Sequence, residues 1–138
     1  MEENISGAIS GALDPDSKEA LIHAEQYYES VRKMKNDVKS IAQNTGNTNE
    51  YISKIKNHLF MKKHDLGGEN LEYFHPDFEI GQSWQRLMMG KDIQFHDHIL
   101  LKHEYLEQEY ILEGYSQQQA HDMANDKYNY TKALNERR

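Results

Sequence analysis

Apolar side chains recur every three or four positions through most of this chain, which is the spacing of one face of a helix. Ile52, Ile55 and Leu59 form the clearest stripe, and Trp84 and Leu87 belong to a second one. The two Pro and the modest number of Ile and Val argue against an all-β fold. The pattern therefore predicts an all-α protein.

Turn and capping residues divide the chain into six predicted helices joined by short links. They are predicted at about 14–34, 38–46, 47–63, 76–90, 92–114 and 116–134. The longest internal loop, 64–75, contains Gly67 and Gly68, which disfavour a regular helix. Residues 1–13 look like a linker or tail, so we expect one helical effector domain over 14–138.

The predicted helix 92–114 is apolar on most of its sides, which is typical of a central, buried helix. We therefore expect a single compact all-α domain of five or six helices packed around it. His103 and Glu107 lie one turn apart within its apolar arc. Because unpaired polar groups are costly to bury, this pair indicates an ion pair, a metal site or a catalytic site.

The string His103-Glu104-Tyr105-Leu106-Glu107 is an H-E-x-x-E variant of the zinc motif H-E-x-x-H. Its spacing directs His103 and Glu107 toward one metal ion, with Glu104 as a candidate base. A divalent cation such as Zn, Mg or Mn is the corresponding cofactor. A core His–Glu ion pair that orients the helix is the structural alternative.

Further histidines border the apolar faces of other predicted helices. His58 lies beside the stripe of Ile55, and His121 lies near the direction of Tyr128 on the last helix. His121 is the candidate third metal ligand beside His103 and Glu107, with His58 as a substitute, and His64 begins the glycine loop. These side chains are expected to converge on one pocket, although each alone could be an ordinary half-buried histidine. We expect His96 at the surface or at a helix cap.

The formal charge is −7, with eight His and no Cys among 138 residues. The absence of Cys excludes disulfide scaffolds, thiolate zinc sites and cysteine nucleophiles. No apolar run is long enough to span a membrane, and no signal-peptide pattern opens the chain. Residues 32–63 carry eight Lys or Arg against two acids, a local charge of +6. This segment is a candidate phosphate-binding surface, unless its lysines serve only solubility.

Seven side chains are candidates for holding a substrate. They are Lys54, Lys56, Lys62, His64, Glu79, Trp84 and Tyr128. Arg86 shares a helix face with Glu79 and could bind a phosphate through two hydrogen bonds. A solvated ion pair for Arg86 and a core position for Trp84 are the alternatives.

Several short blocks occur in an order that resembles a known family. They are Asp37-Val38 with Ile41-Ala42 and Asn44-Thr45-Gly46, Ile55-Lys56-Asn57-His58-Leu59-Phe60, His64-Asp65-Leu66, Phe74-His75-Pro76-Asp77, Trp84-Gln85-Arg86-Leu87, Leu100-Leu101-Lys102-His103-Glu104 and Ala120-His121-Asp122. The series, within 22–131, resembles the C-terminal modules of bacterial polymorphic toxins and of phage head-morphogenesis (minor capsid) proteins. His75 departs from the Asp or aromatic residue expected there.

That resemblance implies an antibacterial toxin module of a larger secreted or phage-borne protein. Such a module usually attacks nucleic acid in the bacterial cytoplasm and is neutralised by a cognate immunity protein. The residues suggest phosphodiester cleavage, with His103 as base or metal ligand, Glu107 orienting it, His121 or His58 as acid, and Arg86 on phosphate. A metal-dependent hydrolase or peptidase is one alternative. A non-enzymatic DNA-binding or capsid-associated helical module, with a helix-turn-helix at 36–63, is another.

Overall fold

A computed structural model describes residues 14–137 of the chain. This part contains seven α-helices and one π-helical turn, η1. Their bounds are α1 Lys18–Lys33, α2 Asp37–Thr45, α3 Asn49–Lys56, η1 Asn57–Met61, α4 Phe78–Met89, α5 Phe95–Leu112, α6 Gln117–Lys127 and α7 Tyr130–Glu136. Within 14–137 there is no strand, only an isolated antiparallel bridge between His64 and Glu72. The predicted all-α class is confirmed.

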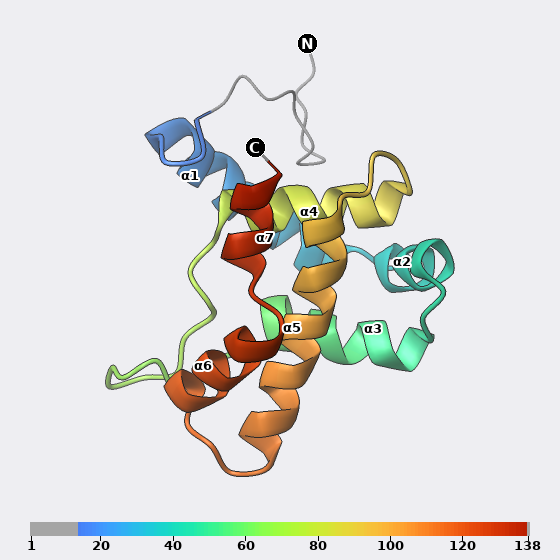
Figure 1. Cartoon of the computed structure of the whole chain (residues 1–138). Coiled ribbons are helices and arrows are strands. Elements are labelled where there is room, and N and C mark those ends of the chain that lie inside the picture. The colour runs from blue at the N-terminus through green and yellow to red at the C-terminus, as the bar shows by residue number, and fades with distance from the viewer. Residues whose placement is uncertain (1–13, 138) are drawn as a thin grey trace.

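The central position of α5 is also confirmed. It packs against α3, α4, α6, α7 and η1. Figure 1 shows α5 running through the middle of the molecule, with α6 and α7 on one side of it and α2 and α3 on the other. Leu100 and Leu101 of α5 join the buried core, whose largest side chain is Trp84. One hydrophobic core therefore holds α1 to α5 and η1 together, while α6 and α7 pack against α5.

Two predicted helices differ from the observed ones, and both differences shape the site. The predicted helix 47–63 ends in the π-helical turn η1, where the wider winding leaves His58 buried. The predicted helix 116–134 is interrupted at Tyr128, whose backbone is extended, and Asn129 caps α7 by accepting a hydrogen bond from the Lys132 N–H. The break between α6 and α7 turns the Tyr128 carbonyl toward α5.

Helix starts follow capping chemistry, but not always at the predicted residue. The Ser17 hydroxyl caps α1 three positions after the predicted start at Asp14, so the helix begins at Lys18, and Asp77 rather than Pro76 is the N-cap of α4. Before α5, Asp92 has a positive φ of 56°, and Gln94 forms a capping box with Asp97. The predicted boundaries were therefore wrong by up to four residues at these starts.

A buried polar group joins α2, α3 and α4. Lys56 Nζ lies 2.9 Å from Asp37 Oδ1 and donates to the Met34 carbonyl at 3.0 Å, and Trp84 Nε1 donates to Asp37 Oδ2 at 3.1 Å. Trp84 is fully buried and Lys56 is 9% exposed. The structure thus places these two substrate-binding candidates in the core.

None of the helices between residues 14 and 137 combines the length and apolarity needed to cross a bilayer.

Candidate histidine–glutamate centre

The Glu107 carboxylate lies at the middle of a cluster of polar side chains. Its Oε1 lies 2.6 Å from His58 Nε2 and accepts a hydrogen bond from Gln117 Nε2 at 3.0 Å. Its Oε2 lies 3.0 Å from His121 Nδ1 and 3.3 Å from His103 Nε2. Glu107 therefore has two sides, one toward His58 and the other toward His103 and His121.

Three elements that are distant in sequence supply these residues. Residues 103 and 107 are one turn apart on α5 and face the same way, and η1 contributes His58. On α6, Gln117 and His121 are likewise one turn apart and both reach Glu107. His58, His103 and His121 thus converge on the Glu107 carboxylate. We call this group, with Glu104, the His–Glu centre.

His103 has an acceptor at each ring nitrogen. Its Nδ1 lies 2.9 Å from the Tyr128 carbonyl oxygen, and its Nε2 faces Glu107. Burial opposes the charged form, but the hydrogen bond to Glu107 and the nearby carboxylate of Glu104 outweigh it and raise the pKa of His103. A doubly protonated ring would donate to both acceptors, and the raised pKa of His103 favours that form.

The two carboxyl groups of α5 titrate in opposite directions. Burial and the neighbouring charge of Glu107 raise the pKa of Glu104 to about 8. Burial alone would also raise the pKa of Glu107, yet hydrogen bonds from His103 and His58 hold it well below its usual range. At neutral pH Glu107 is therefore the ionised carboxylate of the cluster. Glu104 Oε1 lies 3.5 Å from His58 Nε2 and has no hydrogen-bond partner.

His121 is the member of the centre that reaches solvent. Its side chain is 47% exposed, whereas that of Glu107 is 3% exposed. The amide of Asn125 lies 3.4 Å from His121 Nε2. If the Asn125 amide donates to His121 Nε2, that nitrogen is unprotonated. The proton of the neutral His121 ring is then on Nδ1, which donates a hydrogen bond to Glu107. A buried carboxylate thus orients an accessible imidazole.

His64 contacts the backbone that carries His58. Its Nε2 donates to the His58 carbonyl at 2.8 Å, and its ring stacks on Phe74 with a centroid separation of 4.0 Å. Burial lowers the pKa of His64, so the ring is neutral at physiological pH. His64 therefore positions the η1 backbone that carries His58.

A cavity of about 680 Å³ opens beside the centre, a volume that suits a small ligand or part of a polymer. Residues 62–67 form one wall and 115–118 another. It borders the His–Glu centre through His64 and Gln117, and Lys62 and Lys63 bring positive charge to its wall. Lys62 thus stays available as a phosphate contact.

Two groups of side chains in the centre could hold a metal ion, and they share Glu107. One is the predicted set His103, Glu107 and His121, and the other is His58, Glu104 and Glu107. In each group the candidate ligand atoms lie within 4.8 Å of one another. The donors are imidazole nitrogens and carboxylate oxygens, which suit Zn²⁺ and Mn²⁺.

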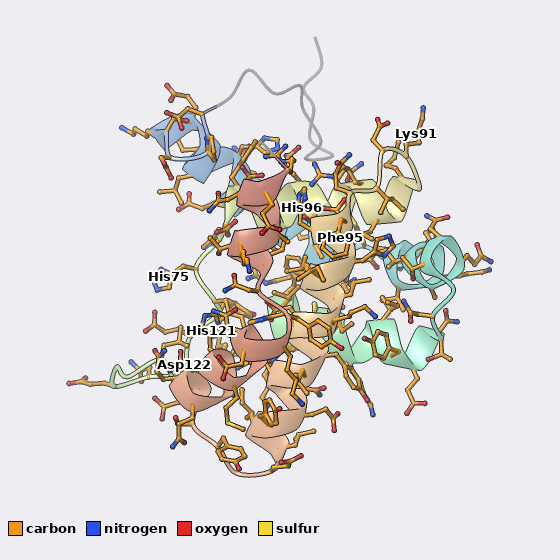
Figure 2. All side chains as sticks on the ribbon, in the orientation of Figure 1. His75, Lys91, Phe95, His96, His121 and Asp122 are labelled. Atoms are coloured by element: carbon orange, nitrogen blue, oxygen red, sulfur yellow. The ribbon has the colours of Figure 1, made fainter. Side chains whose placement is uncertain are left out.

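Arg86 does not join this centre. Its Nε and Nη2 each lie 2.8 Å from the Asp97 carboxylate, so the bidentate partner is Asp97 rather than a phosphate. His96 Nε2 lies 3.1 Å from Arg86 Nη2. His96 is buried at the start of α5, away from His121, so its predicted surface position was wrong (Figure 2). These contacts make Arg86 a link between α4 and α5.

The remaining candidates lie apart from Glu107 or contribute a backbone atom to the centre instead of a side chain. Lys54 is half exposed and pairs loosely with Glu50 at 3.8 Å. Glu79 lies on α4, 3.9 Å from Arg137. Tyr128 contributes its backbone carbonyl to His103 rather than its ring. The structure therefore assigns no shared site to Lys54, Glu79 and Tyr128.

Sequence reasoning missed Gln117 as a functional residue. Its amide donates to Glu107, and it also lines the cavity. The one available signal was its position four residues before His121 on a helix, which places both on one face.

Family models, curated proteins and solved structures were compared with the chain, and none of them matches it.

Proposed function

We propose that this chain is a hydrolase domain that cleaves phosphodiester bonds of nucleic acid. The observation that carries the proposal is the accessible His121 held by the buried Glu107 carboxylate at 3.0 Å. A carboxylate that accepts from Nδ1–H fixes the tautomer of the imidazole and stabilises the imidazolium that forms when Nε2 takes a proton. This is the arrangement of a general base.

In the proposed reaction, His121 Nε2 removes the proton of the attacking water or ribose hydroxyl. The leaving oxygen departs on the opposite side of the phosphorus in an in-line displacement, so it takes its proton from solvent, and the imidazolium later returns its own proton to solvent. His103 and His58 keep the Glu107 carboxylate ionised and in place through both steps. Lys62 and Lys63 beside the cavity would neutralise the phosphate.

Support for a toxin comes from the resemblance to polymorphic-toxin and minor capsid modules. On that basis we expect the domain to act in the bacterial cytoplasm after delivery by a secreted or phage-borne parent protein. We also expect a cognate immunity protein that neutralises it. A partner that covers His121 and the cavity would inhibit the proposed reaction directly.

The proposal is tested by incubating the purified chain with labelled RNA and DNA oligonucleotides in Mg²⁺, Mn²⁺, Zn²⁺ or EDTA. His121→Ala should reduce cleavage by about 100-fold or more. His75→Ala is the matched control, because His75 is exposed and projects away from the body of the molecule (Figure 2). Intact RNA and DNA under every condition, or full activity of His121→Ala, would refute the proposal.

A metal-dependent hydrolase or peptidase is the second candidate, favoured by the spacing of His103, Glu107 and His121. Two imidazoles and one carboxylate are the ligands of a catalytic zinc site with an open position. In that case activity would be lost in EDTA and restored by Zn²⁺. The non-enzymatic helix-turn-helix alternative loses support because Lys56, a basic residue within 36–63, is buried against Asp37.

A further inference from the structure

The inner side of the His–Glu centre, made of His58, Glu104 and Glu107, is almost fully buried. Glu104 is 7% exposed, and the other two residues are 1% and 2% exposed. Buried polar atoms normally have partners, yet Glu104 Oε1 has none and points toward His58 at 3.5 Å. Gln117 Oε1 and His58 Nδ1 are also buried without a partner, and Gln117 is the residue whose Nε2 donates to Glu107 Oε1. These orphaned oxygens indicate a ligand.

We propose that His58, Glu104 and Glu107 bind one divalent cation, with the Gln117 amide oxygen as the fourth ligand. This set is distinct from the His103–Glu107–His121 set that the H-E-x-x-E spacing predicts. It makes Glu104 a ligand rather than a base.

The distances fit such an ion. Zinc bonds to nitrogen and oxygen of about 2.0–2.2 Å place tetrahedral ligand atoms roughly 3.3–3.6 Å apart. His58 Nε2 lies 3.5 Å from Glu104 Oε1, and 2.6 Å from Glu107 Oε1. The first separation already has the required value, and the second needs to widen by less than about 1 Å, a side-chain adjustment.

The fourth ligand follows from the orientation of one amide. Gln117 Nε2 lies 3.0 Å from Glu107 Oε1, while its Oε1 is buried and unpartnered. Ion binding would break that hydrogen bond, because turning the amide by 180° exchanges the two atoms and places Oε1 instead of Nε2 beside Glu107 Oε1. Two oxygens at that distance repel each other unless a cation lies between them. The turn therefore places an oxygen ligand where the ion needs one.

Charge favours the same position. An ionised Glu104 beside Glu107 would put two like charges together in a buried place, which is unfavourable. A divalent cation neutralises both carboxylates at once. One imidazole with carboxylate and amide oxygens is a donor set suited to Zn²⁺ or Mn²⁺. Four protein ligands make a closed site, which is typical of a structural ion.

We call the opposite side of the centre, made of His103, His121 and Glu107 Oε2, the outer side. Its polar atoms already have hydrogen-bond partners. His103 is bonded at both ring nitrogens, to Tyr128 and Glu107. His121 is bonded through Nδ1 to Glu107, with Asn125 beside Nε2. Within the His–Glu centre, the buried oxygens without partners are Glu104 Oε1 and Gln117 Oε1, so the ion belongs on the inner side.

The proposed ion would tie η1, α5 and α6 together through Glu107 Oε1. It leaves Oε2 free to orient His121, and its binding does not depend on the proposed hydrolysis. The experiment measures metal on the full-length chain by elemental analysis after dialysis. Titration with Zn²⁺ and Co²⁺ follows, because four-coordinate Co²⁺ has strong visible absorption. We expect one ion per chain and a tetrahedral Co²⁺ spectrum.

Glu104→Gln is the deciding variant, since it removes one carboxylate ligand while keeping the side-chain shape. We expect its Zn²⁺ affinity to fall at least tenfold, whereas Glu113→Gln on the exposed end of α5 keeps wild-type affinity. Gln117→Leu provides a second test at a position near the surface, and it should weaken binding if Glu104→Gln fails to fold. His121→Ala should keep the ion while losing hydrolysis, which separates the two proposals.

Three outcomes would overturn the site. The first is no bound metal and no saturable Zn²⁺ or Co²⁺ binding by the wild-type chain. The second is unchanged affinity in both Glu104→Gln and Gln117→Leu, which would mean that Glu104 is a protonated buried acid. The third is loss of the ion in His121→Ala with retention in Glu104→Gln, which would assign the metal to the outer set.

Discussion

His121 Nδ1 lies 3.0 Å from Glu107 Oε2, although 14 residues and the turn between α5 and α6 separate them. The imidazole is half exposed and the carboxylate is buried. One partner can therefore exchange protons with solvent or substrate while the other keeps a fixed charge. This relationship connects the central helix of the fold to a surface where chemistry is possible.

Glu107→Gln should lower the pKa of His103. The hydrogen bond to Glu107 is the largest interaction that offsets burial and raises that pKa, and the carboxylates of Glu104 and Glu107 add to it. NMR of the imidazole nitrogens across a pH titration would measure the change in both proteins. An unchanged His103 pKa in Glu107→Gln would show that Glu107 does not stabilise the imidazolium.

Arg86→Ala should destabilise the fold without altering the chemistry of the centre. It removes the bidentate partner of Asp97, whose side chain is fully buried, and breaking such a pair costs about 3–5 kcal/mol. Urea unfolding would measure the loss. Arg137→Ala is the control, because its contact with Glu79 is long at 3.9 Å and exposed. Equal effects of the two substitutions would contradict the structural role of Arg86.

Lys56 and Lys62 should differ in what their loss affects. Lys56→Met leaves the buried Asp37 carboxylate without an opposite charge, so the free energy of unfolding should fall by roughly 3 kcal/mol. Lys62→Met should leave stability within about 0.5 kcal/mol, because Lys62 is exposed beside the cavity. Nucleic-acid binding, measured by fluorescence anisotropy at low salt, should weaken for Lys62→Met. A loss of stability in Lys62→Met, with weaker nucleic-acid binding only in Lys56→Met, would contradict these two roles.

High pH should unfold the protein through its buried tyrosines. Burial raises the pKa of Tyr27, Tyr28 and Tyr130 above the usual value of 10.0. Each group keeps its proton longer in the folded state, so its contribution to stability is complete below pH 10 and decreases as pH rises beyond it. Tyrosinate absorbance and circular dichroism should therefore change together for these three residues. Full ionisation of all nine tyrosines in a folded chain would contradict this expectation.

Tyr27→Phe tests one part of that expectation. Tyr27 Oη donates to Gln85 Oε1 at 2.8 Å in the core. Without the hydroxyl, the alkaline transition should move to higher pH, while stability at pH 7 should fall by about 1 kcal/mol because the Gln85 acceptor is left buried. Circular dichroism during a pH titration would show both effects.

Local rules in the sequence determine most of the helices. The stripe of Ile52, Ile55 and Leu59 and the caps at Ser116 and Gly90 act within one or two turns, so they can be read without the fold. The apolar arc of 92–114 likewise predicts a central helix, and it identifies His103 and Glu107 as polar residues that need partners. Their one-turn spacing also fixes their common direction.

Tertiary contacts decide which partners those residues obtain. The π-helical turn places His58 against Glu107, and the break at Tyr128 supplies the carbonyl for His103. The same long-range packing pairs Arg86 with Asp97, so Arg86 is no longer a candidate for binding phosphate. A sequence pattern reports which way a side chain faces on its own helix, but pairing depends on how separate helices dock. The sequence therefore determined the helices and the chemistry available, and only the fold decided which groups meet at Glu107.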